Sequence, residues 1–593
     1  MIKKQTQYKT QWDLSKPFYT SLDDPRLQKD IEIVKAAFDA FEKKYKNSKK
    51  YLEDTKGLKK ALDEYTALQT ALDPKPLYYI QYILALDSGN SKAQALLNKY
   101  AGELTTYSNK IVFFTLALGK IAQPLQKKFL SDQSLYEYHY FLSQIFKQAK
   151  HQLTEAEEKI LNIKTLTSRT LWIQGSEKLQ NKQTVGFKGK PIPLSEAFNL
   201  LHTLPLIQRR KLSGEIMAIL RSISDFSESE LNAICTDKKA TDELRHFDKP
   251  YSSRALQNEL PEKSIESLVA VVSKNFPVSG EYYGIKKKLL GLSHLEYPDR
   301  IASLGTIKKR FSFDESVQIL RSAFYKAGSE FGSIFDQMLE NGQIDVYPKK
   351  GKTGGAFCSH GIDTPTLVLL NHTNTFNDVI TFGHEMGHAF HAELSKKQIP
   401  LYQHYSTAVA ETASTLFERF VFDEIFERLS EKEKIIALDQ MIMNSLSTIF
   451  RQIAFFNFEN EMHTLVRQKG FLSKEELAQL MNKHVSEYLG KSFKLSEDDG
   501  YFFVMLRHVR NLFYVYTYAF GALVSFSLYE KYKQDSRYIE HITGFLSAGG
   551  SRSPAAIFKD MGIDITNINF FEYGIANIKN DIALLKRLTN KKK

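Results

Sequence analysis

The chain has 593 residues, of which 42% are hydrophobic and 25% are charged, with a net charge of +12 and two cysteines. This length exceeds that of one ordinary domain, and the composition excludes a disordered or fibrous protein. Two cysteines also exclude a disulfide framework. Basic and acidic residues are interspersed and accompany no nucleic-acid-binding motif, so we expect no nucleic-acid partner.

The first third of the sequence has the periodicity of successive amphipathic helices. Apolar residues recur at helical spacing from about residue 28 to residue 180. The glycine- and proline-containing run Gly186–Pro193 interrupts this pattern. We therefore predict an N-terminal helical lobe at residues 1–190 and a second lobe at residues 191–593.

Two short strands and a long helix are predicted next along the chain. The helical pattern resumes after the break, continues to about residue 340, and gives way to extended apolar sequence at 344–348 and 366–370. Thr375, followed three residues later by Asp378, has the pattern of a capping box that begins a helix. This helix is predicted to end near residue 394, and the chain after Glu411 is predicted to be helical again.

The helix predicted after Thr375 contains His384-Glu385-Met386-Gly387-His388, an HExxH arrangement. Residues four apart lie on one face of a helix, so His384 and His388 can bind the same Zn²⁺. Glu385 is then placed to act on a water molecule at the metal. The alternative interpretation is an amphipathic helix with two solvated histidines, and the five-residue pattern alone does not decide between the two.

A catalytic zinc usually takes three protein ligands and leaves a fourth position for water, so a third ligand is needed. Glu411 lies 23 residues after His388, among small residues that would let a second helix approach the first closely. Glu418, two turns later, is a candidate to hold one ligand histidine by its second ring nitrogen. A solvated surface position is the alternative for both glutamates.

HExxH followed by ExxSxxxE resembles the M3 peptidases, a family that includes thimet oligopeptidase and oligoendopeptidase F. Further segments are similar to the oligoendopeptidase F branch, in the same order along nearly the whole chain. These segments are Trp12–Ser15, Asp23–Pro25, Gly354–Cys358, Phe450–Gln452 and Phe513–Ala519. The resemblance implies a mostly α, two-lobed metallopeptidase with a deep substrate channel and a small β-sheet beside the zinc helix.

The resemblance also implies an activity and a cofactor. It implies a zinc-dependent endopeptidase that hydrolyses short, unstructured oligopeptides, with the catalytic lobe at residues 191–593. One Zn²⁺ would be bound by His384, His388 and Glu411. Glu385 would act as the general base and then as the general acid.

In M3 peptidases a histidine and tyrosines near the C-terminus face the zinc. His508 matches that histidine, and Tyr516 is the best match for one tyrosine. On a helix, Tyr514 and Tyr518 share a face roughly opposite to that of Tyr516, so only one of these two sets can face the metal. Arg510 stands where the usual pattern has a tyrosine, and this departure puts the rate and the specificity in question.

Two other functions stay open at this point. A zinc carboxypeptidase of a related helical HExxH family would need a basic residue to bind the C-terminal carboxylate of its substrate, and Arg510 is available. A peptide-binding or structural zinc protein without turnover is the other alternative. Two features argue against this last function: a structural site does not require the base Glu385, and neither cysteine lies at ligand spacing.

The sequence carries no sign of export or membrane insertion. Residues 1–7 contain two lysines but no apolar core follows them, and no run of eighteen apolar residues occurs. We therefore expect a cytoplasmic protein without a membrane partner, whose partners are oligopeptide substrates. The sequence leaves the oligomeric state open.

Overall fold

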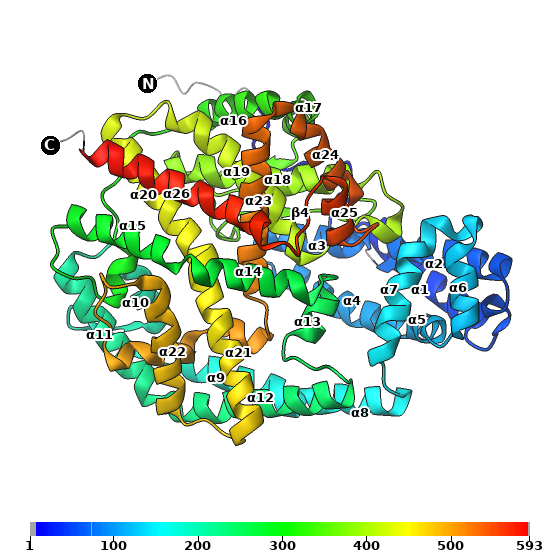
Figure 1. Cartoon of the computed structure of the whole chain (residues 1–593). Coiled ribbons are helices and arrows are strands. Elements are labelled where there is room, and N and C mark those ends of the chain that lie inside the picture. The colour runs from blue at the N-terminus through cyan, green and yellow to red at the C-terminus, as the bar shows by residue number, and fades with distance from the viewer. Residues whose placement is uncertain (1–7, 73, 591–593) are drawn as a thin grey trace.

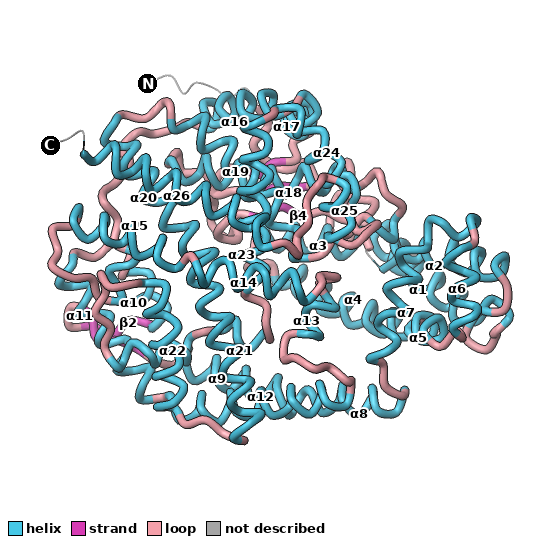
Figure 2. The backbone as a smooth tube through the Cα atoms, viewed as in Figure 1, coloured by secondary structure: helices cyan, strands magenta, loops and turns pink. Residues whose placement is uncertain are grey.

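The computed structural model describes residues 8–72 and 74–590, and nearly all of its regular structure is helical (Figure 1 and Figure 2). The predicted mostly helical, two-lobed fold is confirmed. The prediction that rests on the first seven residues lies outside the described part. Within the described residues, no helix is both long enough and apolar enough to cross a membrane.

The N-terminal helices begin at a well-formed cap. The carboxylate of Asp24 accepts a hydrogen bond from the backbone N–H of Arg26, and Pro25 occupies the first helical position, where its missing N–H is not needed. The helices of this part are α1 (Pro25–Tyr45), α2 (Thr55–Leu72), α3 (Lys75–Leu86), α4 (Ser91–Asn109), α5 (Val112–Gly119), α6 (Gln123–Ser131) and α7 (His139–Gln148). Of these, α1, α2, α5, α6 and α7 form the group at the right of Figure 1.

The predicted break after the first helices contains a β-hairpin that the sequence analysis does not assign. Strand β1 (Thr184–Phe187) pairs antiparallel with β2 (Lys190–Pro193) through a turn in which Lys188 and Gly189 both have positive φ. The helices that precede and follow it in the chain are α8 (Glu155–Thr165), the π-helical turn η4 (Leu166–Thr170), α9 (Leu171–Asn181), α10 (Leu194–Leu200), α11 (Leu206–Ser222), α12 (Ser224–Leu244), α13 (Ser252–Gln257), α14 (Glu262–Lys274) and α15 (Phe276–Leu289).

The predicted strand region forms a small three-stranded sheet in the order β3-β5-β4. Strand β5 (Leu367–Leu369) lies in the centre, parallel to β3 (Ile344–Asp345) and antiparallel to β4 (Phe357–Ser359). The Trp12 indole donates to the carbonyl oxygens of Gln343 and Val368, both at 3.0 Å, and so ties the N-terminal segment to this sheet. Strand β4 is left at an edge.

The sheet is followed by the helix that contains HExxH, α18 (Phe376–Ser395), which begins at the predicted residue. Thr375 and Asp378 form the predicted capping box. The helix packs beside both β4 and β5, so the prediction of a small sheet next to this helix is confirmed. The preceding helices are α16 (Phe313–Ala327) and α17 (Ser329–Glu340).

The rest of the chain is helical, as predicted. The elements are α19 (Thr407–Phe426), α20 (Glu431–Ser445), the π-helical turn η7 (Leu446–Phe450), α21 (Arg451–Lys469), α22 (Lys474–Leu489), the 3₁₀ helices η8 (Glu497–Met505) and η9 (Arg507–Asn511), α23 (Tyr516–Gln534), α24 (Ile539–Ala548), α25 (Pro554–Asp560) and α26 (Ile568–Asn590). Helices α10, α11, α12 and α22 lie at the bottom of Figure 1, and α16 to α20 and α24 to α26 lie above them.

Buried hydrophobic side chains form three clusters. The largest contains buried residues only from Val185 onward and includes the inward faces of α18, α19 and α23. A second cluster lies among the N-terminal helices around Phe114. The third joins the N-terminal segment to β5, where Trp12 and Leu369 belong to the same cluster. The division into lobes at residue 190 stays a prediction.

Candidate metal centre and active site

Helices α18 and α19 pack against each other and carry the three predicted metal ligands. Gly387 lies at their contact. A Cβ atom at this position would lie 2.6 Å from the carbonyl oxygen of Ala413 and 2.6 Å from the Cα atom of Ser414. Only glycine lets the two backbones approach so closely. The small residues around Glu411 therefore allow the close contact between the two helices that the sequence predicts.

His384, His388 and Glu411 converge on one point. One ligand atom from each residue lies within 4.8 Å of the other two. The Oε2 atom of Glu411 is 3.5 Å from Nε2 of His384 and 3.7 Å from Nε2 of His388. No other group of three or more such side chains gathers in this way among residues 8–72 and 74–590. Two imidazole nitrogens and a carboxylate oxygen are a donor set that a catalytic zinc takes.

Each of the three side chains is held by a second contact. The Nδ1 atom of His384 lies 3.1 Å from a carboxylate oxygen of Glu418, the partner that the sequence analysis names. His388 makes a ring N–H hydrogen bond to the backbone carbonyl of Ala410. The Ser414 hydroxyl donates to Oε2 of Glu411 at 2.9 Å. Such outer contacts orient the ligands of metal sites, so these residues fit a zinc ion.

Glu385 is 6% exposed and lies against the small sheet. A backbone hydrogen bond from Cys358 in β4 reaches its carboxylate. Burial raises the pKa of Glu385 to about 7; His384 opposes this rise and Glu411 adds to it. The side chain also faces a cavity of about 490 Å³. The other residues around this cavity are Gly355, Ala356, Leu370, Asn371, His372, Asp378 and Thr381.

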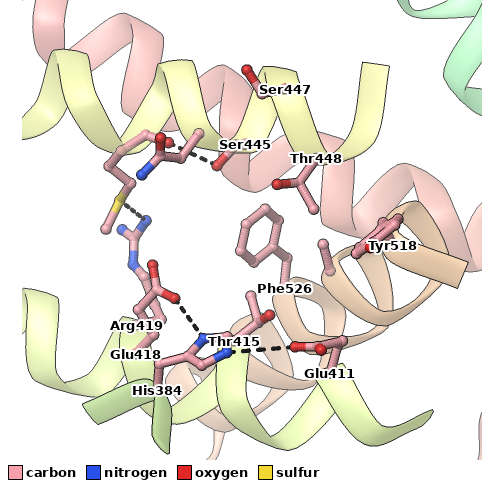
Figure 3. A pocket seen from close by; sticks show the side chains of 13 residues that line it. His384, Glu411, Thr415, Glu418, Arg419, Ser445, Ser447, Thr448, Tyr518 and Phe526 are labelled. Atoms are coloured by element: carbon pink, nitrogen blue, oxygen red, sulfur yellow. Dashed lines mark hydrogen bonds and ion pairs between the residues drawn. The ribbon is translucent and has the colours of Figure 1, made fainter. Parts of the chain in front are cut away.

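The rings of three residues near the C-terminus, His508, Tyr514 and Tyr518, lie together beside the pocket of the metal centre. The rings of His508 and Tyr518 are 5.7 Å apart, and those of Tyr514 and Tyr518 are 5.3 Å apart, both at right angles. Tyr518 lines the same pocket as His384 and Glu411 (Figure 3). The set of Tyr514 and Tyr518 is therefore the one on the metal side.

Tyr516, named in the sequence analysis as the best match for a catalytic tyrosine, lies elsewhere. Its side chain is completely buried, and its hydroxyl accepts a hydrogen bond of 2.7 Å from Asn258. It does not line the pocket that contains His384 and Glu411. The physical reason is helical geometry: Tyr516 is two residues from Tyr518 on α23 and points toward the protein interior.

Arg510 does not line the pocket that contains His384 and Glu411. It is 5% exposed and forms an ion pair with Glu230 of α12, with N–O distances of 2.7 and 2.6 Å. A further nitrogen donates to the backbone carbonyl of Leu506. The basic residue that a carboxypeptidase would need is therefore already engaged.

The pocket beside the metal centre has a volume of about 420 Å³. Figure 3 shows His384 and Glu411 on one wall, and Ser447 and Thr448 on the facing wall. These two residues belong to the π-helical turn η7, and π-helical turns are frequent at functional sites. Neither residue could be predicted as part of the site, because neither composition nor spacing distinguishes a π-helical turn from an ordinary helix.

The chain is mostly helical, and its HExxH helix packs beside a second helix that supplies a glutamate. This arrangement defines a metallopeptidase. The model of peptidase family M3 matches residues 215–576, which is more than half of the chain, and the model described as Oligopeptidase F matches residues 118–178. The chain belongs to peptidase family M3 and is a metalloendopeptidase similar to oligoendopeptidase F.

Individual relatives agree with this membership. The chain is 27% identical over 589 residues to an oligoendopeptidase F homolog of Borreliella burgdorferi, covering 96% of this chain and 97% of the relative. It is 27% identical over 497 residues to the oligopeptidase PepF of Bacillus subtilis, covering 81% of this chain and 73% of the relative.

Solved structures share the fold. The crystal structure of a Chlamydophila abortus protein has a TM-score of 0.86 with 23% identity, and the match covers 98% of both chains. The crystal structure of oligoendopeptidase-F from Enterococcus faecium has a TM-score of 0.70 with 18% identity, covering 95% of this chain and 100% of the other. At these identities the likeness establishes the fold alone.

Proposed function

We propose that the protein is a zinc-dependent endopeptidase in which His384, His388 and Glu411 bind one Zn²⁺. The observation that carries the proposal is the convergence of these three side chains, whose ligand atoms lie within 4.8 Å of one another. The carboxylate of Glu418 and the backbone of Ala410 hold the two imidazoles from behind. Three protein ligands leave a coordination position for a reactant, as a catalytic zinc requires.

Zinc bound there supplies Lewis-acid chemistry, since it lowers the pKa of water to about 7 and polarises a peptide carbonyl. Glu385 moves the proton. Its carboxylate takes a proton from the attacking water as the new C–O bond forms. It then gives this proton to the amide nitrogen as the C–N bond breaks, so that the amine leaves neutral. The Cys358 hydrogen bond fixes the carboxylate during both transfers.

The negative charge that develops on the carbonyl oxygen needs further donors, and His508, Tyr514 and Tyr518 supply them. Burial lowers the pKa of His508, which keeps its imidazole neutral and able to donate an N–H. Burial also raises the pKa of Tyr518, which keeps its hydroxyl protonated. We assign this role to Tyr518 and Tyr514 in place of Tyr516. Donors aimed in advance at a developing charge are usually a large part of catalysis.

The substrate is proposed to be a short, unstructured oligopeptide. A cavity of about 420 Å³ is lined by His384, and another of about 490 Å³ is lined by Glu385, the next residue of α18. Strand β4 is an edge strand that contacts Glu385 through the backbone of Cys358, so an extended peptide could pair with this edge. A cytoplasmic location, and the absence of nucleic-acid and membrane partners, stay predictions from the sequence.

The carboxypeptidase alternative loses its support. It required a cationic side chain to capture a terminal carboxylate, and Arg510 is buried in an ion pair with Glu230. Cleavage inside the peptide needs no such group.

The test uses synthetic peptides of 5 to 20 residues that are acetylated at the N-terminus and amidated at the C-terminus. Products are identified by mass spectrometry after incubation with the zinc-loaded enzyme, the chelated enzyme and the chelated enzyme restored with zinc. We expect internal cleavage of the shorter peptides in the first and third samples only. Cleavage that requires a free terminus would contradict the proposal, as would full activity in the chelated sample.

A further inference from the structure

The segment Leu506–Val515, here called the strap, connects η8 to α23 and carries His508 and Tyr514, whose rings lie beside that of Tyr518. It contains two consecutive residues in the left-handed region, Leu512 with φ of 48° and Phe513 with φ of 56°. Neither is a glycine, and the strap contains no glycine at all. A side chain with a Cβ atom adopts this conformation at a steric cost, so the surroundings must hold the strap in place.

Guanidinium groups hold the strap from one side. Three consecutive backbone carbonyls of the strap, those of residues 510, 511 and 512, each accept a hydrogen bond from an arginine. Arg169 of η4 donates to the first at 2.6 Å. Arg254 of α13 donates to the second and, through Nε, to the third at 3.0 Å. Hydrogen bonds with a charged donor are stronger than neutral ones, so these contacts resist rotation of the strap.

The buried carboxyl group of Glu459 holds the strap through a backbone N–H. The amide of Phe513 donates to Oε1 of Glu459 in α21 at 2.7 Å, and both residues are completely buried. The phenyl ring of Phe513 packs 5.0 Å from the ring of His463 and 5.7 Å from that of Phe456, measured between centroids. Glu459 therefore fixes the residue whose backbone conformation is unusual.

The strap lies between the elements that hold it. In Figure 1 the chain leaves the lower end of α23 and passes between α21 and α13, which carry Glu459 and Arg254. Immediately after Phe513 comes Tyr514, whose ring is parallel to that of His508 at 6.3 Å. The position of these two rings beside Tyr518, which lines the pocket of the metal centre, therefore depends on the backbone turn at residues 512 and 513.

We propose that Glu459 and Arg254 are positioning residues of the peptidase, which hold the turn at Leu512 and Phe513 and thereby aim His508 and Tyr514 at the substrate. Arg169 assists from the neighbouring carbonyl. None of the three lines the pocket that contains His384 and Glu411, so they act through the strap. This inference rests on the proposed function, since it takes His508 and Tyr514 to be donors to the reacting carbonyl.

The first test compares two replacements of Glu459. Glu459→Gln keeps an oxygen that can accept the Phe513 N–H, whereas Glu459→Leu fills similar space without an acceptor. We expect kcat within about threefold of wild type for Glu459→Gln, and a loss of tenfold or more for Glu459→Leu with KM and zinc content little changed. Equal kcat for the two variants would overturn the proposal.

A double-mutant cycle separates positioning from general destabilisation. Glu459→Leu is combined with His508→Ala/Tyr514→Phe, which removes the groups that Glu459 is proposed to aim. We expect Glu459→Leu to cost less than about twofold in kcat in this background. If the losses in kcat caused by Glu459→Leu and by His508→Ala/Tyr514→Phe simply multiply, the two sites act independently and the inference is overturned. If His508→Ala/Tyr514→Phe itself leaves kcat unchanged, the proposed donors are wrong and the inference fails with them.

Arg254→Met provides a second route should Glu459→Leu fail to fold, because Arg254 is only half-buried. Its matched control is Arg221→Met, which removes a solvent-exposed ion pair with Asp498. A second control, Leu142→Ala in α7, destabilises a buried position remote from the strap. We expect Arg254→Met to lose at least tenfold in kcat while both controls stay within about twofold. A similar loss in the controls would overturn the proposal.

Discussion

The Nδ1 atom of His384 lies 3.1 Å from a carboxylate oxygen of Glu418, which is on α19 two turns after Glu411. This contact leaves the Nε2 atom of His384 directed at Glu411. Because the contact fixes both the ring orientation and the tautomer, Glu418→Ala is expected to weaken zinc binding by about 10- to 100-fold. Competition with a fluorescent zinc chelator measures the change, and an unaltered zinc affinity would show that Glu418 is dispensable.

Glu385→Gln is expected to retain one zinc per chain and to lose nearly all activity. The amide keeps the shape of the side chain and can still accept the Cys358 hydrogen bond, but it cannot take a proton from water. Glu393→Gln, on the same helix but paired with Lys396 and outside the pocket, is the matched control. Turnover of Glu385→Gln within tenfold of the control would mean that another group acts as the base.

Tyr518→Phe and Tyr516→Phe separate the two faces of α23. Tyr518 lines the pocket with His384 and Glu411, so loss of its hydroxyl should reduce kcat by about 10²-fold or more. Loss of the Tyr516 hydroxyl removes a hydrogen bond from Asn258 and should reduce the free energy of unfolding by about 1 kcal/mol, with kcat little changed. Steady-state kinetics and thermal unfolding of both variants test this pair, and the reverse pattern would restore Tyr516 as the catalytic tyrosine.

Glu459 should make stability depend on pH. Burial raises the pKa of Glu459 to about 8, against the opposing effects of the Phe513 hydrogen bond, Arg254, Lys238 and Arg169. A carboxyl group in the unfolded chain ionises near pH 4.3. The folded state therefore retains the proton over this interval, and stability that is fully present below about pH 4.3 is lost as the pH rises to about 8.

Glu459→Gln removes this titration. We expect the variant to gain stability relative to wild type as the pH rises from 5 to 8, by an amount on the order of a few kcal/mol. Cys235 and His463 also lie near this carboxylate, but burial raises the pKa of the first and lowers that of the second to about 3, so both stay neutral over the interval. Thermal unfolding at four pH values measures the difference, and parallel curves for the two proteins would contradict the expected ionisation.

Features set by short-range sequence could be predicted well. The start of α18 follows from the capping box of Thr375 and Asp378, and the shared face of His384 and His388 follows from helical periodicity. The choice of Glu411 came from the resemblance combined with the small residues around it. The helix contact at Gly387 supplies the physical reason, since any Cβ atom there would meet the backbone of α19.

Features that depend on long-range contacts could not be predicted. Periodicity places Tyr516 opposite Tyr518, but it does not indicate which of the two faces points at the metal. The engagement of Arg510 depends on Glu230, which is 280 residues away in the chain. The positive φ angles of Leu512 and Phe513 could not be predicted, because neither residue is a glycine. Hydrogen bonds with side chains distant in the sequence hold this turn.

One zinc ion bound jointly by His384, His388 and Glu411 is the basis of the proposed activity. The most direct measurement is an anomalous difference map from a crystal of the zinc-loaded protein, collected on both sides of the zinc absorption edge. We expect a single peak about 2.0–2.2 Å from one nitrogen of each histidine and from a carboxylate oxygen of Glu411. A zinc peak bound by other residues, or no peak at these three in protein that is active, would contradict it.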